Sequence, residues 1–553
     1  MYIDTGKSKS NQRVLLRESY REGGRVRHRT IANISRCKPE EINAIAWALK
    51  NKNAFADSAS PSFADTERQG LSAGGVWTVF QIARELGIVD ALGHDRQGRL
   101  ALWQVIARVL DQGSRLSAVR LAQTHAACDI LGLDAFTEDD LYANLKWLSE
   151  HQSGIEDRMF RRRENGKTAV YLYDVTSSYV EGDCNALATF GYNRDGKKGK
   201  KQIVAGLLCD EAGEPLSVEV FPGNTSDCKT VPCQLKKISK RFGGGEIIFV
   251  GDRGMLKSSQ ISDVEEHGFH YITGLTKPQI ESLLKENVIQ MSLFDHELCE
   301  VDDGDLRYII RRNPVRVQEI RSSRDNKIDK LVALAGKENK YLSEHVKASP
   351  EKALARVKAK AEKLRIAGIL KIASDDRVVS VEKDEAAYTE NARLDGCYVL
   401  KTDVSHEVAL KEIIHNRYKD LSQVEWAFRT SKTGELEMRP LYVRSEASTR
   451  GHVFVVMLAY RIVRELAKRW RDLDMTVEEG LSELEQLCTT EVIVDGATLC
   501  QRFPVPRQST ARILRAGGIV LPEVLPSRKV IVATRKNLAE KRQLYKSKRV
   551  SNG

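Results

Sequence analysis

The sequence of 553 residues lacks several features that would place the protein in a membrane, outside the cell or around a structural zinc ion. Its most conspicuous apolar run, Val453–Tyr460, has eight residues, whereas a helix needs roughly 20 to span a bilayer. The first residues contain no apolar stretch typical of a signal peptide. The 10 cysteines are scattered and none has CxxC spacing, which argues against a zinc ribbon or a redox motif. We therefore expect a cytoplasmic protein with reduced cysteines and no membrane partner.

Acidic residues are too few to balance the basic ones. Lys and Arg number 87 against 76 Asp and Glu, so the net charge is +11. This excess favours a polyanionic partner such as nucleic acid, although a merely basic soluble protein would have the same charge. The length allows roughly three to four domains of about 150 residues each.

Two apolar stretches each end at an aspartate. Residues 169–173 lead into Asp174, and residues 247–251 lead into Asp252. Both stretches have the composition of buried strands, and a single Asp in this position is usually a turn or capping residue. Two such strands would instead bring two carboxylates to one end of a sheet. Hard divalent cations such as Mg²⁺ prefer oxygen ligands of this kind.

A third acid, Glu425, lies in a segment with helical periodicity. One helix face would contain residues spaced by 3, 4, 3 and 4 positions: Tyr418, Leu421, Glu425, Phe428 and Lys432. The rest of this face is apolar or aromatic, so we expect Glu425 to be buried, and a buried carboxylate needs a partner. A metal ion shared with the two aspartates would satisfy it, and an ion pair with Lys432 is the alternative.

These residues resemble the DDE triad of insertion-sequence transposases. The pattern Tyr418-x2-Leu421-x3-Glu425-x6-Lys432 is similar to the signature of the IS4 superfamily, which has Arg where this chain has Leu421. The chain most resembles the IS1634-like subgroup, over about residues 171–460 and the N-terminal hairpin. The segments that carry the resemblance are Tyr173–Tyr179, Phe190–Gly199, Gly223–Ser226, Gly251–Gly254, Arg439–Tyr442 and Arg450–His452.

The resemblance implies that Asp174, Asp252 and Glu425 are both catalytic residues and metal ligands. They would hold two Mg²⁺ ions, with Mn²⁺ as a substitute, about 3.5–4 Å apart. The enzyme would cut the ends of its element and join each 3′-OH to target DNA. Its partners would be double-stranded DNA, namely terminal inverted repeats and target, and a second copy in a synaptic homodimer near the bacterial nucleoid. Two alternatives stay open: a nuclease with the same core but no strand transfer, and a non-catalytic DNA-binding protein derived from a transposase.

Basic and aromatic residues near the three acids are the predicted DNA contacts. Those residues are Lys197, Lys198, Lys200, Lys201, Arg253, Tyr418, Arg429 and Lys432. The four lysines form a dense basic loop suited to phosphates, although a charged hairpin tip has the same composition. Arg417 and Arg429 are candidates to replace the arginine absent at position 421. In the upstream helical segment, Arg115, Arg120 and Arg161–Arg163 are further candidate phosphate contacts.

The order of predicted elements indicates an α/β fold with a ribonuclease-H-like mixed sheet. Over residues 168–275 the pattern is β-β-β-α-β-α-β, and the two aspartates follow the first and fourth strands. The long gap before Glu425 indicates an insertion, which the resemblance implies is mainly β. The predicted domains are an N-terminal β-hairpin and linker (1–60), a helical DNA-binding domain (61–165), the first part of the core (166–275), a β-rich insertion (276–405), the second part of the core (406–470) and a helical C-terminal region with a basic tail (471–553).

Two local predictions complete this scheme. Gly23-Gly24 lies between two stretches of strand composition, which predicts a hairpin. One face of its second strand would carry Arg25, Arg27 and Arg29, either to contact DNA or to protect a sheet edge. Within the insertion, Glu351–Arg365 is a predicted helix. The predicted strands of the insertion are 306–311, 330–334, 377–382 and 396–401.

Overall fold

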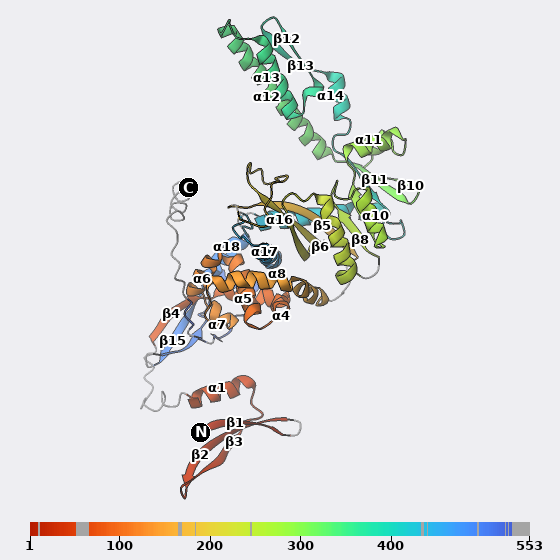
Figure 1. The fold of residues 1–553 in the computed structure, drawn as a ribbon. Coiled ribbons are helices and arrows are strands. Elements are labelled where there is room, and N and C mark those ends of the chain that lie inside the picture. The colour runs from red at the N-terminus through yellow and green to blue at the C-terminus, as the bar shows by residue number, and fades with distance from the viewer. Residues whose placement is uncertain are drawn as a thin grey trace. The chain divides into compact units, whose positions relative to one another are not determined.

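The computed structural model describes most of the chain (Figure 1). The described residues are 1–8, 11–50, 66–163, 169–182, 184–243, 246–432, 436–439, 441–494, 497–525, 527–528 and 530–532. Most of the predicted linker and of the basic tail lie outside them. The chain divides into two compact units. The first contains Met1–Leu71, Cys488–Val505 and Pro522–Ser527, and the second contains Ser72–Leu487, Pro506–Leu521 and Arg528–Gly553. Across the described residues, no helix has the length and apolar composition needed to cross a bilayer.

The first unit contains the predicted hairpin. Strands β1 (Tyr2–Ser8), β2 (Asn11–Glu22) and β3 (Arg25–Asn33) form an antiparallel sheet, and α1 (Pro39–Lys50) follows. Gly23 and Gly24 turn between β2 and β3 with φ values of 57° and 77°, a conformation that favours glycine. Arg27 and Arg29 pair with Glu22 and Glu18 across the hairpin, which favours the protected-edge interpretation of this face.

A second sheet in this unit corrects the prediction of a wholly helical C-terminal region. Its strands are β4 (Thr66–Ser72), β15 (Cys488–Val494), β16 (Ala497–Arg502) and β17 (Val524–Leu525). Strand β15 is rich in the β-branched residues Thr, Val and Ile, which favour a pleated surface over a helix. The helices predicted downstream of the core are limited to α18 (Val477–Glu485) and α19 (Gln508–Ala516) within the described residues.

In the second unit, residues 74–161 are helical, as predicted. The helices are α3 (Gly74–Glu85), α4 (Ile88–Leu92), α5 (Arg96–Leu110), α6 (Arg115–Thr124), α7 (Ala127–Leu131) and α8 (Glu138–Arg161). A distant helix, α17 (Glu446–Arg469), packs against α5, α8 and strand β7 (Pro215–Pro222). Its long apolar stripe, buried from Val453 to Leu466, therefore joins the helices to the sheet.

The largest sheet has eight strands in the order β10-β11-β14-β9-β8-β5-β6-β7. Strands β5 (Val170–Tyr179), β6 (Gln202–Asp210) and β7 are antiparallel neighbours, whereas β8 (Ile248–Gly251) and β9 (His270–Gly274) run parallel to β5. Antiparallel strands β14 (Cys397–Thr402), β11 (Leu306–Arg312) and β10 (Cys299–Asp303) extend the sheet beyond β9. The fold is therefore mixed α/β, as predicted.

Side chains of β5 alternate between the two faces of this sheet. Tyr171, Tyr173 and Val175 belong to an apolar core that also contains residues of α9 (Val231–Lys237) and α10 (Ser258–Glu266). The intervening side chains, including Asp174, consequently lie on the opposite face. Helix α16 (Leu421–Lys432) packs against β5.

The insertion is mainly helical, which corrects the prediction of a mainly β domain. Helices α12 (Pro314–Glu344) and α13 (Pro350–Leu364) run side by side (Figure 1). They are followed by the hairpin β12 (Leu370–Asp375) and β13 (Val378–Lys383) and by α14 (Glu385–Ala392). The predicted strand 330–334 lies inside α12, because a short apolar run does not distinguish a strand from a buried helix turn. The predicted strands 306–311 and 396–401 exist, but they belong to the large sheet.

Candidate active site

The two aspartates lie next to each other on the sheet. Parallel strands β5 and β8 pair in register from Val170–Ile248 to Tyr173–Gly251. Asp174 and Asp252 are the next residues of the two segments, so they lie at the same level and on the same face. The side chain of Asp174 is partly buried, whereas Asp252 is exposed. The predicted convergence of these two acids is thus present.

Glu425 lies on helix α16, which packs against β5, but its side chain is not buried as predicted. Leu421, Val424 and Phe428 are buried, whereas Glu425 is exposed at the border of this buried face. The expectation of burial was wrong because Glu425 lies beside the buried stripe of α16 and not within it. Helix α15 (Lys411–Lys419) ends before Asp420 and α16 begins after it, so spacing does not carry across the break.

Electrostatics link the three acids. Burial, together with the charges of Asp252 and Glu425, raises the pKa of Asp174 to about 7. The backbone N–H of Val175, which donates to Asp174 Oδ1 over 2.7 Å, and the charge of Arg194 act in the opposite direction. The charges of Asp252 and Glu425 oppose the ionisation of Asp174, and a bound cation would relieve this repulsion.

Tyr418 contacts one of these acids. Its hydroxyl donates to Asp252 Oδ1 over 3.2 Å, and the backbone N–H of Arg253 donates to the same oxygen over 2.6 Å. Burial raises the pKa of Tyr418, so the phenol remains a proton donor at neutral pH. A Cβ at Gly274 would lie 2.6 Å from the Tyr418 oxygen, so the glycine leaves room for this ring. Tyr418, predicted to contact DNA, therefore orients a candidate metal ligand.

Lys432 is also engaged within the protein. Its Nζ donates to Asp195 Oδ1 over 3.0 Å, Arg439 pairs with the same oxygen, and the Tyr179 N–H donates to Oδ2 over 3.2 Å. The Asp195 side chain is only 2% exposed. Asp195 is not among the residues predicted from the sequence, although an acid surrounded by basic residues, as in Arg194–Lys201, is a recognisable signal. Lys432 thus holds the loop after β5, which contrasts with its predicted contact with DNA.

The other predicted DNA contacts differ in their surroundings. Lys198 and Arg253 are exposed, and Lys197 lies 5.9 Å from the ring centre of Tyr179. Lys200 forms an ion pair with Glu181 at 2.7 Å, and Lys201 is partly buried.

Arg429 is exposed at a cleft that the sequence did not reveal. The cleft has a volume of about 890 Å³. Besides Glu425 and Arg429, its lining includes Trp426, Arg464, Lys468 and Arg471. The lining also includes Glu214, which pairs with Arg464, and Glu465, so a cleft of mixed charge borders Glu425.

Two of the upstream arginine predictions were wrong. Arg115 is 5% exposed, donates to Gln104 Oε1 over 2.5 Å and contacts His452 Nδ1 at 2.9 Å. Burial lowers the pKa of Arg115 to about 9. Arg163 pairs with the buried Asp210. These side chains hold the interior together, so they are not available to phosphates.

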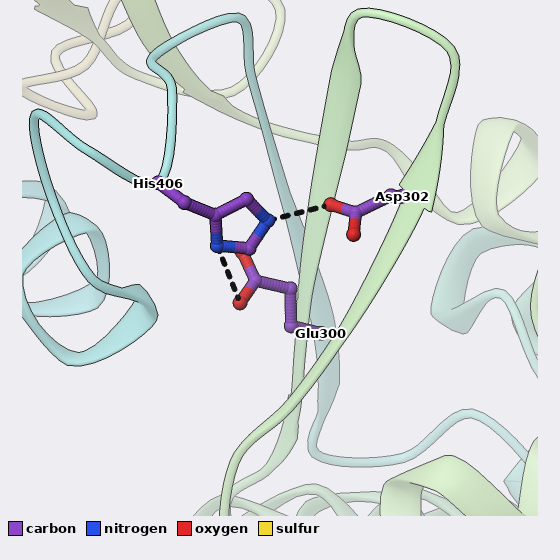
Figure 2. A group of neighbouring side chains, drawn as sticks. All are labelled: Glu300, Asp302 and His406. Atoms are coloured by element: carbon purple, nitrogen blue, oxygen red, sulfur yellow. Dashed lines mark hydrogen bonds and ion pairs between the residues drawn. The ribbon is translucent and has the colours of Figure 1, made fainter.

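A second cluster of possible metal ligands lies on the extended part of the sheet (Figure 2). Within the described residues, the atoms of Glu300, Asp302 and His406 all lie within 4.8 Å of one another, a distance that the three catalytic candidates do not all meet. His406 Nε2 is 3.0 Å from Asp302 Oδ1, and Nδ1 is 3.8 Å from Glu300 Oε2. Arg307 pairs with the other Glu300 oxygen at 2.6 Å. Each ring nitrogen of His406 faces its own carboxylate, so the imidazole bridges the two acids.

Family comparisons agree with the resemblance seen in the sequence. Residues 165–462, more than half of the chain, match the transposase DDE domain, and residues 3–62 match the N-terminal domain of IS1634 family transposases. The chain belongs to the DDE transposases, which cut and join DNA with divalent metal ions. Within this class it is an insertion-sequence transposase of the IS1634 type.

One solved structure similar to the chain is the cryo-EM structure of a piggyBac transposase synaptic complex with hairpin DNA. The two share 10% identity with a TM-score of 0.34, over 74% of this chain and 75% of the other. A search of curated proteins gave no match.

Proposed function

We propose that Asp174, Asp252 and Glu425 are the metal ligands and catalytic residues of this transposase, on a ribonuclease-H-like core. The proposal rests mainly on the in-register placement of the two aspartates beside the helix of Glu425. Three antiparallel strands followed by two parallel ones, in the order β7-β6-β5-β8-β9, are consistent with such a core.

The charge of the site supports cation binding. Among the described residues, none of the three acids forms an ion pair with a Lys or Arg side chain. Most other acids near them are paired, as Asp195 is with Lys432 and Asp227 with Arg194. Exclusively oxygen ligands suit Mg²⁺, with Mn²⁺ as a substitute. Two such ions would activate a water molecule or a 3′-OH and stabilise the leaving oxygen.

The chain's own residues would then position the DNA. Tyr418 fixes the orientation of Asp252 through its hydrogen bond. Lys197, Lys198 and Arg253 would contact phosphates of the strand being cut, and Arg429 would contact phosphates that enter the cleft. The substrates would be the terminal inverted repeats and then target DNA, held by a synaptic homodimer. The helical domain upstream would recognise the repeats.

A cleavage assay tests the assignment. The protein is incubated with Mg²⁺ and a duplex carrying the inverted repeat found in the DNA that flanks its gene. Asp174→Asn, Asp252→Asn and Glu425→Gln should each lose at least about a hundredfold in rate while still binding the duplex. Glu412→Gln, an exposed acid on α15, is the matched control. If Glu425→Gln cuts as well as the wild type, the triad is wrongly assigned.

A strand-transfer assay separates the transposase from a nuclease with the same core. Pre-cleaved ends with a free 3′-OH are mixed with plasmid target, and joined products are counted. A transposase joins them in a Mg²⁺-dependent manner, whereas a nuclease yields only cut DNA. If the wild-type protein cuts the ends but does not join them to the plasmid, the proposed strand-transfer step is wrong.

A further inference from the structure

The loop between β5 and β6 carries two large exposed aromatic side chains. Phe190 is 65% exposed and Tyr192 is 82% exposed. Aromatic rings in a loop are usually turned inward, because exposure forfeits the free energy gained by burying them. Exposed aromatic rings at a nucleic-acid site are surfaces on which bases stack.

These rings project from a firmly held base. A Cβ at Gly191 would lie 2.0 Å from the carbonyl oxygen of Gly223, so the backbones there touch. Gln202 Nε2 donates to the Tyr192 carbonyl over 3.0 Å and to the Gly223 carbonyl over 2.9 Å. Further along the loop, the buried Asp195 is held by Lys432 and Arg439. The exposure of the two rings is therefore a property of a fixed surface.

The loop is attached to both elements that carry candidate catalytic acids. The backbone N–H of Arg194 donates to Ser177 Oγ over 3.0 Å, three residues beyond Asp174 on β5. Lys432, which holds Asp195, is the last residue of the helix that carries Glu425. The loop is therefore joined both to the strand of Asp174 and to the helix of Glu425.

Charge around the rings suits a single strand of DNA. The Arg194 guanidinium lies 5.8 Å from the ring centre of Tyr192 and is fixed by Asp227, with bonds of 2.6 and 2.7 Å. Exposed Lys197 and Lys198 follow within the same loop. We propose that Phe190 and Tyr192 stack on an unpaired nucleobase beside the phosphate being cut, while Lys197 and Lys198 contact the backbone of that strand. A base within a duplex already has neighbours on both faces, so the partner must be unpaired. The inference rests on the proposed function.

Binding measurements with intact and abasic DNA test this contact. The probe is the inverted-repeat duplex with one strand left unpaired beside the cut, and an abasic site is placed in turn at each unpaired position, in Ca²⁺ to prevent cleavage. Tyr192→Ala should weaken binding of intact DNA about tenfold, the effect of losing one base–aromatic stack. Tyr192→Phe keeps the ring and should bind as the wild type does. Tyr341→Ala, which removes a 48% exposed tyrosine from α12, is the control.

The abasic probes give the decisive comparison. At one position, the abasic site should weaken wild-type binding and leave Tyr192→Ala unaffected, because the stack is already lost. Stacking is refuted if Tyr192→Ala binds every probe more weakly than the wild type by the same factor. It is also refuted if Tyr192→Ala binds intact DNA as tightly as the wild type does. If the wild type neither binds nor cuts the repeat, the proposed function itself fails. Thermal unfolding of each variant separates these results from misfolding.

Discussion

Lys432 and Asp195 form an interior ion pair, 3.0 Å between Nζ and Oδ1, that ties the loop after β5 to the helix of Glu425. Their side chains are 10% and 2% exposed. Replacing Lys432 by an uncharged residue leaves the buried Asp195 carboxylate with less compensation, although Arg439 remains beside it. We therefore expect Lys432→Met to lower the free energy of unfolding by about 1–3 kcal/mol.

Chemical denaturation of Lys432→Met measures this loss, and Arg429→Met, which changes an exposed residue of the same helix, is its control. A direct phosphate contact would have a different signature: lower DNA affinity, a smaller salt dependence and unchanged stability. Observing that combination for Lys432→Met would show that Lys432 contacts DNA and does not stabilise the fold.

Asp174 should make the metal-free protein sensitive to pH. Its folded-state pKa is raised to about 7, whereas the unfolded carboxyl titrates near its usual value of about 4. Between these values the folded state binds more protons, so the free energy of unfolding falls as pH rises from about 4 to about 7. Asp174→Asn removes this effect and should stabilise the metal-free protein at pH 8 by roughly 1–3 kcal/mol, a value reduced by solvent screening.

Adding Mg²⁺ should make the wild type more stable than Asp174→Asn at pH 8. Wild-type protein gains stability that rises with the logarithm of the Mg²⁺ concentration above Kd, whereas Asp174→Asn gains little. Thermal unfolding at pH 5 and pH 8, with EDTA or Mg²⁺, measures all four conditions. A wild type that is more stable at pH 8 than Asp174→Asn in EDTA would argue against the electrostatic conflict among the three acids.

Tyr418 should matter for metal binding more than for folding. Tyr418→Phe removes only the hydroxyl that donates to Asp252 Oδ1. Loss of a hydrogen bond that orients a metal ligand typically weakens metal affinity by about 10–100-fold. We expect cleavage by Tyr418→Phe to need correspondingly more Mg²⁺ and to recover partly at saturation. Gly274→Ala, whose Cβ would crowd the same oxygen, should act in the same direction. A Mg²⁺ titration identical to the wild type for both variants would contradict this role.

The sequence predicted the large sheet well because its strands are continuous apolar runs. The predicted order of strands over residues 168–275 is that of β5, β6, β7, β8 and β9, although β5 continues to Tyr179 instead of ending at Asp174. The prediction for residues 330–334 failed because Leu331 and Ala335 are buried on one face of α12, a spacing that a five-residue window does not reveal.

The surroundings of the site were less accessible from sequence. The break at Asp420 separates Tyr418 from the helix of Glu425, and no glycine or proline marks it. The contacts of Lys432 with Asp195 and of Arg115 with His452 join residues more than 200 positions apart. Local pattern assigns such side chains to a helix face, but tertiary packing decides whether they meet solvent, DNA or a buried partner.

The lysine loop offers a matched pair of substitutions. Lys198 is exposed, whereas Lys200 is held by Glu181 at 2.7 Å. Each phosphate contact releases counterions, so removing one should reduce the slope of log affinity against log salt by about 0.9. We expect Lys198→Ala to show this reduction and to weaken binding equally for specific and unrelated duplexes. Lys200→Ala should have a smaller effect, because part of its charge is already neutralised. Titrations from low to high salt on both duplexes measure the slopes. Equal slopes for the two variants would mean that the ion pair with Glu181 opens when DNA binds.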